Sequence, residues 1–76
     1  MEMETMENLE FAVEMAIKEN KSLSLLITLP DLDSPEMITN PVENLEKKLE
    51  YYKATYDDNL EHRHAYGIKI VGYSIG

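Results

Sequence analysis

The sequence predicts a single α+β domain over residues 1–76, with the element order α-β-α-β and a two-stranded sheet in each chain. Two segments carry hydrophobic residues at helical spacing, and two others alternate as strands do. The length of 76 residues leaves room for one small core. The chain has no cysteine, which excludes disulfides and thiolate metal sites.

Residues 5–19 form the first predicted helix. Its hydrophobic residues recur three and four positions apart and share one face. They are Met6, Leu9, Ala12, Val13, Ala16 and Ile17. Thr5 is the expected N-cap, because its hydroxyl can accept a hydrogen bond from a free N–H of the first turn.

Residues 22–29 predict the first strand, because hydrophobic and polar side chains alternate along them. Pro30 ends this strand. Residues 30–40 predict a loop, since they contain two prolines and two aspartates. Met37 and Ile38 are expected to turn the end of this loop against the core.

Residues 41–60 predict the second helix. Asn40 is the expected N-cap, and Pro41 suits the first helical position. The hydrophobic stripe that follows is narrow. It comprises Val42, Leu45, Leu49, Tyr52, Tyr56 and Leu60.

Residues 61–65 connect this helix to a second strand at 66–75. The alternation of that strand breaks in its middle, and one extra residue at Val71–Gly72 would restore it, so we expect a β-bulge there. If the two strands are neighbours, the connection through the second helix makes them parallel.

A sheet of two strands leaves two unpaired edges, and such a pair is marginally stable in water. Lys69 is the only charge in either predicted strand. We therefore expect a homo-oligomer, with a dimer favoured, in which strands of two copies join one sheet. The alternative is a monomer whose edges are covered by residues 30–40 and by the N-terminal residues.

The outer face of the first helix carries a candidate interaction surface. Phe11 and Met15 lie opposite the hydrophobic stripe, and an apolar centre with a charged rim is typical of an interface. The rim consists of Glu4, Glu7, Glu14 and Lys18. Contact with a second copy is the alternative to contact with a foreign partner. Tyr51, on the polar side of the second helix, is a candidate interface anchor.

The chain is acidic, with 15 Asp and Glu against 7 Lys and Arg and a net charge of −8. This charge argues against direct binding of nucleic acid or an anionic membrane, both of which need clustered cations. Residues 1–36 contain nine acids and two lysines. If the first helix and the loop lie side by side, they form a negative surface for a basic host protein. The alternative is that the charge serves solubility.

His62 and His64 are weak metal candidates, because a His-x-His pair near carboxylates can hold zinc or nickel. The sequence supplies no clear fourth ligand, and we assign no metal. No nucleophile or carboxylate pair has the sequence context of a catalytic site. We therefore predict that the protein is not an enzyme and needs no cofactor.

The segments Ile38–Tyr52, Asp57–Leu60 and Gly67–Gly72 resemble small uncharacterised proteins of phages and prophages of Gram-positive bacteria. The resemblance covers about the last half of the chain and implies an accessory phage function. The sequence shows no basic and apolar signal segment at its start and no membrane span, so we expect a cytoplasmic protein.

Three functions follow as hypotheses. The first is a non-catalytic interaction protein that self-associates and binds a host or phage protein. The second is an acidic inhibitor, either a nucleic-acid mimic or an anti-defence protein, that blocks a basic nucleic-acid-binding protein. The third is a small metal-binding module at His62 and His64.

Overall fold

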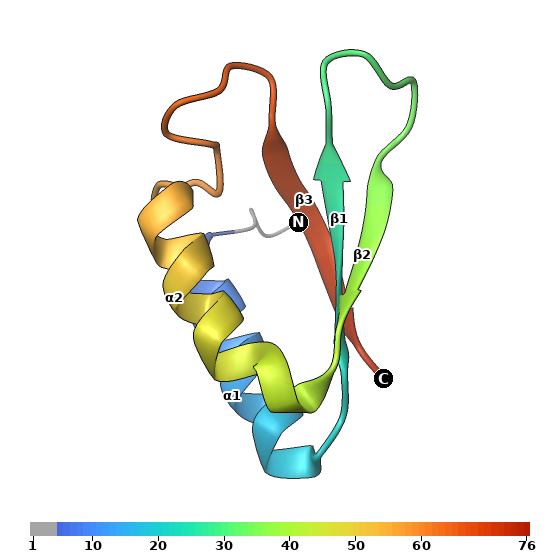
Figure 1. Cartoon of the computed structure of the whole chain (residues 1–76), viewed down its shortest axis with the longest axis vertical. Coiled ribbons are helices and arrows are strands. Elements are labelled where there is room, and N and C mark those ends of the chain that lie inside the picture. Colours follow the sequence, from blue (N-terminus) through green and yellow to red (C-terminus); the bar gives the residue numbers. More distant parts are fainter. Residues whose placement is uncertain (1–4) are drawn as a thin grey trace.

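A computed structural model describes residues 5–76. Two helices pack on one face of a three-stranded antiparallel sheet, and the other face of the sheet carries no helix (Figure 1). This confirms the α+β class. The element order is α-β-β-α-β, and the prediction of two strands in each chain is wrong.

Helix α1 spans Met6–Glu19, close to the predicted 5–19. The Oγ1 of Thr5 accepts a hydrogen bond from the N–H of Asn8 at 3.2 Å, which confirms the predicted N-cap. The helix ends at Asn20, whose left-handed backbone (φ 58°) turns the chain into the sheet.

The sheet contains β1 (Leu23–Thr28), β2 (Glu36–Asn40) and β3 (Lys69–Ile75), in the order β2-β1-β3. The predicted loop over 30–40 is therefore wrong in its second half, because residues 36–40 form β2. This strand has no alternating pattern, because its two hydrophobic residues, Met37 and Ile38, are adjacent and four of its five residues are exposed. β1 and β3 are antiparallel neighbours, not parallel, because β2 reverses the chain before the second helix begins.

The predicted bulge is confirmed. Leu26 of β1 pairs with Gly72 of β3, and the next residue, Ile27, pairs with Ile70. Val71 is thus the extra residue.

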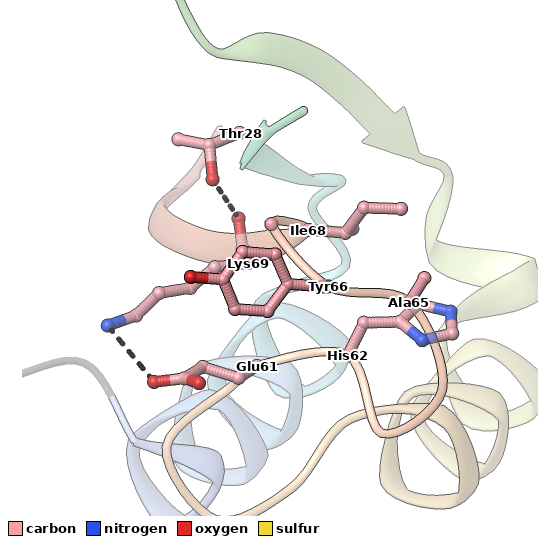
Figure 2. Close-up of a pocket in the computed structure, with 8 residues that line it drawn as sticks. Thr28, Glu61, His62, Ala65, Tyr66, Ile68 and Lys69 are labelled. Atoms are coloured by element: carbon pink, nitrogen blue, oxygen red, sulfur yellow. Dashed lines mark hydrogen bonds and ion pairs between the residues drawn. The ribbon is translucent and has the colours of Figure 1, made fainter. Parts of the chain in front are cut away.

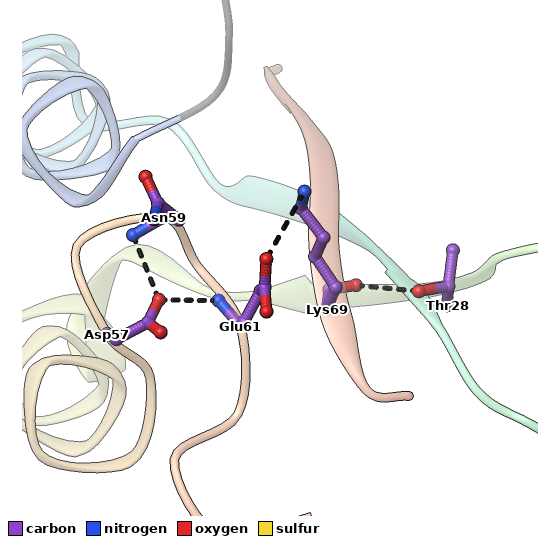
Figure 3. Close-up of polar contacts among 5 residues, drawn as sticks. All are labelled: Thr28, Asp57, Asn59, Glu61 and Lys69. Carbon is purple, nitrogen blue, oxygen red and sulfur yellow. Dashed lines mark hydrogen bonds and ion pairs between the residues drawn. The ribbon is translucent and has the colours of Figure 1, made fainter. Parts of the chain in front are cut away.

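The second helix, α2, spans Leu45–Thr55 and follows a short 3-10 turn, η1 (Val42–Asn44). It ends five residues before the predicted end, because the side chain of Asp57 takes up backbone N–H groups that a continued helix would bond to its own carbonyls. Asp57 Oδ1 accepts hydrogen bonds from the N–H groups of Asn59 (2.9 Å) and Glu61 (3.0 Å), which closes a turn (Figure 3).

Asn40 does not cap the second helix as predicted, because it is the last residue of β2 and its side chain is buried. Its Nδ2 donates to the carbonyl of Leu23 at 3.5 Å, and the hydroxyl of Tyr52 donates to its Oδ1 at 3.4 Å. Asn40 is the buried polar residue of the described core. This pair fastens the end of β2 to α2.

The core lies between the helices and one face of the sheet. Its largest fully buried side chains come from both helices, from β1 and β3, and from the turn after α2. They include Leu9, Leu23, Leu25, Leu45, Leu60 and Ile70. Leu60 reaches this core with a left-handed backbone (φ 64°), a conformation that costs a non-glycine residue about 1–2 kcal/mol.

Candidate interaction surfaces

The outer face of α1 exposes Phe11, as the helical spacing predicts. Its side chain is 67% exposed, and none of the core residues of α1 lies on this face. Met15, four residues on, is half-buried. The apolar centre of this surface is therefore mainly the ring of Phe11.

Two carboxylates flank Phe11. Glu7 and Glu14 are exposed, and neither forms an ion pair with a cation of residues 5–76. By contrast, Glu10 contacts Lys53 of α2 at 3.4 Å. Glu4, which the sequence places in the rim, lies outside the described residues. We refer to Phe11, Met15, Glu7 and Glu14 as the α1 patch.

Tyr51 lies on α2 and is 52% exposed. The Nζ of Lys48 sits 5.4 Å from the centre of its ring, within range of a cation–π contact. At 100° per residue, Tyr51 projects about 160° away from Lys53, the residue that contacts α1. Tyr51 therefore belongs to a different surface from the α1 patch.

The acidic segments of the chain do not form one surface. In Figure 1 the hairpin loop between β1 and β2, which holds Asp31 and Asp33, stands at one end of the sheet. Helix α1 approaches the sheet at its other end, where Asn20 leads into β1. The combined negative surface considered from the sequence is therefore absent from the described structure.

A shallow depression of about 320 Å³ opens beside the start of β3 (Figure 2). Its lining includes Thr28, Glu61, His62, Tyr66 and Lys69. The Nζ of Lys69 and the carboxylate of Glu61 are paired at 3.9 Å across it. Tyr66 is fully exposed, and sequence analysis did not single it out because its position was assigned to a strand.

His62 and His64 do not form a metal centre with other described residues. The Nδ1 of His62 accepts a hydrogen bond from the backbone N–H of His64 at 3.0 Å, so one ring nitrogen is already engaged. Among residues 5–76, no group of three or more His, Asp or Glu side chains gathers to hold a metal ion. The ring of His62 packs edge-on against Tyr56, with 5.3 Å between the ring centres.

The outer edge of β2 is a further exposed surface, which the sequence did not predict. Met37 is 63% exposed and Ile38 is 37% exposed. Met37 pairs with Leu26 across the uncovered face of the sheet, and on the same face Ser24 and Thr39 share a hydroxyl hydrogen bond of 3.0 Å. The exposed residues of β2 offer backbone and apolar contacts together.

Burial raises the pKa of two tyrosines above the usual 10.0. Desolvation is the main cause for Tyr52, and the nearby Tyr51 adds to it. Desolvation also dominates for Tyr56. Both rings belong to the buried core.

No protein-family model matches the chain, and no curated protein or solved structure matches it either. In the described part of the chain, no helix has the length and apolar character needed to cross a membrane.

Proposed function

We propose that this chain is a small acidic, non-catalytic protein that acts by binding other proteins, both a second copy of itself and a foreign partner. The observation that carries the proposal is Phe11, two-thirds exposed on the outer face of α1. A large apolar side chain in this position favours binding, because burying it removes its surface from water.

The charges beside Phe11 specify the kind of partner. Glu7 and Glu14 form no ion pair with a cation of residues 5–76, so a partner can supply one without breaking an existing pair. We infer that the partner has an apolar pocket for Phe11 with lysines or arginines at its rim. The resemblance of the second half of the chain to phage proteins supports an accessory phage role, in which the partner is a host or phage protein.

The experiment is quantitative capture of partners from lysates of Gram-positive bacteria, with the wild-type chain and single variants as bait. The Phe11→Ser variant is expected to lose at least about 90% of a specific partner, equivalent to about 1.4 kcal/mol or more of binding free energy. Tyr66→Ser is the matched control, because it also removes an exposed aromatic ring, from the loop before β3. Equal capture by the wild type and both variants would reject the α1 patch.

A second candidate function is an acidic inhibitor of a basic nucleic-acid-binding protein. It is favoured by the carboxylates of Glu7 and Glu14, which form no ion pair within residues 5–76, and by the acidity of α1, which has four glutamates and one lysine. Salt separates the two candidates. An inhibitor held by charge should lose its partner steeply when salt is raised, whereas a complex centred on Phe11 should persist.

A further inference from the structure

We propose that two copies of this chain pair through the outer edge of β2, with the two β2 strands antiparallel about a twofold axis at Ile38. This inference rests on the proposed function, since it assigns the self-association to one strand and one register. The result would be a continuous six-stranded sheet with all four helices on one face.

The backbone N–H and C=O groups of Met37 and Thr39 point outward from the edge of the sheet, away from β1. The N–H of Gly76 donates to the carbonyl of Ser22 at 3.0 Å, so the backbone groups of Ser22 face β3. Successive residues of a strand direct these groups to opposite sides, so every second residue of β1, starting at Leu23, faces β2. The residues of β2 that bond to β1 are therefore Glu36, Ile38 and Asn40.

The outward groups of β2 have no backbone partner among residues 5–76. The strand also lacks the devices that protect an edge, because it contains no proline or lysine and its one charge, Glu36, lies at its end. The start of β3, by contrast, is covered on its outer side. There the N–H of Ile70 donates to the carbonyl of Leu60 at 2.9 Å, and an isolated bridge joins Glu61 to Lys69.

Two prolines select the register. Pro35 and Pro41 flank β2 and lie three residues on either side of Ile38. In the register centred on Ile38, Met37 of each copy faces Thr39 of the other, so both hydrogen-bonded pairs have their N–H groups. A register centred on Met37 or on Thr39 places a proline opposite one of these residues, and a proline has no N–H to donate.

The side chains of β2 are also compatible with a twofold axis at Ile38. Ile38 pairs with the buried Leu25 and therefore points to the helix side, yet it is 37% exposed because it lies at the border of the core. In a non-hydrogen-bonded pair the two Ile38 residues would approach to a Cα distance of about 4.5 Å, which joins the two cores. Glu36 would face the neutral Asn40 of the second copy, so no like charges oppose each other.

Repulsion between the helices of the two copies would be weak at this edge. Helix α2, which reaches β2 through Tyr52 and Asn40, carries three lysines and two glutamates. The acidic α1 contacts β3 and β1 instead, and would remain far from the axis. The side of α2 that points away from α1 presents Tyr51, so the candidate anchor from the sequence would lie beside the second copy.

The test uses the absence of cysteine in the natural chain. Single variants Ile38→Cys, Met37→Cys, Thr39→Cys and Phe11→Cys are oxidised gently, and disulfide-linked dimer is measured over time. In the proposed register the thiols introduced at position 38 meet at a Cα distance within the disulfide range. Those introduced at position 37 or at position 39 stay about 8 Å apart at Cα, beyond that range.

We expect Ile38→Cys to cross-link about tenfold faster than the other three variants. Faster linkage of Met37→Cys or Thr39→Cys would replace the register, and faster linkage of Phe11→Cys would move the contact to α1. The wild-type chain provides a second measurement that needs no variant. Exchange of the Met37 and Thr39 amide hydrogens should slow as concentration rises from about 10 μM to about 1 mM, a range that spans weak interfaces.

A wild-type mass of 8.8 kDa at every concentration, with no amide protection, would overturn the β2 pairing. It would leave the binding of a foreign partner through Phe11 intact, because that arm is measured separately by capture. If instead the wild type and Phe11→Ser capture partners equally while cross-linking at position 38 is preserved, the binding of a foreign partner through Phe11 is rejected and the β2 pairing stands.

Discussion

The hydrogen bond between Tyr52 and Asn40 is expected to stabilise the end of β2, and the variant Tyr52→Phe tests it. This change removes one hydroxyl and retains the ring in the core. Tyr52 is 4% exposed and Asn40 is 2% exposed, so water cannot readily replace the lost donor. The Oδ1 of Asn40 would be left buried without the donor it has now.

The magnitude follows from the geometry. At 3.4 Å the bond is longer than the usual 2.7–2.8 Å between hydroxyl and acceptor oxygens, so its own net contribution is near the low end of the range, about 0.5 kcal/mol. An unsatisfied buried acceptor adds about 1 kcal/mol. We therefore expect Tyr52→Phe to lower the free energy of unfolding by about 1.5 kcal/mol, and to lower Tm by about 6–12 °C for a domain of this size.

The assay is urea unfolding followed by circular dichroism, with Tyr51→Phe as the matched control. Tyr51 is the adjacent residue, but it is 52% exposed, so removing its hydroxyl should change stability by less than about 0.5 kcal/mol. The two variants should have the same dependence on urea. Equal stability of both variants would show that the Asn40–Tyr52 contact does not hold β2.

Two further predictions concern the tyrosines of the core and Gly67 in the loop before β3. Burial raises the pKa of Tyr52 and of Tyr56 in the folded chain, so their contribution to stability is complete below pH 10 and declines as the pH rises above it; a chain more stable at pH 11 than at pH 8 in urea unfolding would contradict this. Gly67 has a φ of 88°, and a Cβ added there would lie 3.2 Å from the side chain of Pro30, so Gly67→Ala should cost about 1–2 kcal/mol of unfolding free energy. Gly72→Ala is its control, because its added Cβ would meet only the flexible side chain of Leu26 at 3.4 Å, and equal losses in the two variants would refute the role of the backbone at Gly67.

One of the candidate surfaces could be predicted from the sequence and another could not. The exposure of Phe11 could be predicted from the spacing of α1, because the hydrophobic stripe defines the buried side and so the outer side as well. The edge of β2 could not be predicted in this way. Its exposed side chains carry little burial pattern, and its prolines indicated a loop, although they flank the strand and lie outside it.

By itself, the sequence determined α1, β1 and the bulge in β3, since each depends on local spacing of hydrophobic residues or on one glycine. Tertiary structure decided the end of α2, where the Asp57 turn leads to a buried Leu60 with a left-handed backbone. It also decided the strand order, because β2 is held by its ladder with β1 and by a buried bond from Asn40 to a residue 12 positions later. The Asp57 turn itself is local, but the burial of Leu60, the ladder of β2 with β1 and the Asn40–Tyr52 bond are long-range contacts. The energy of such contacts depends on which segments meet in space rather than on the residues within any one segment.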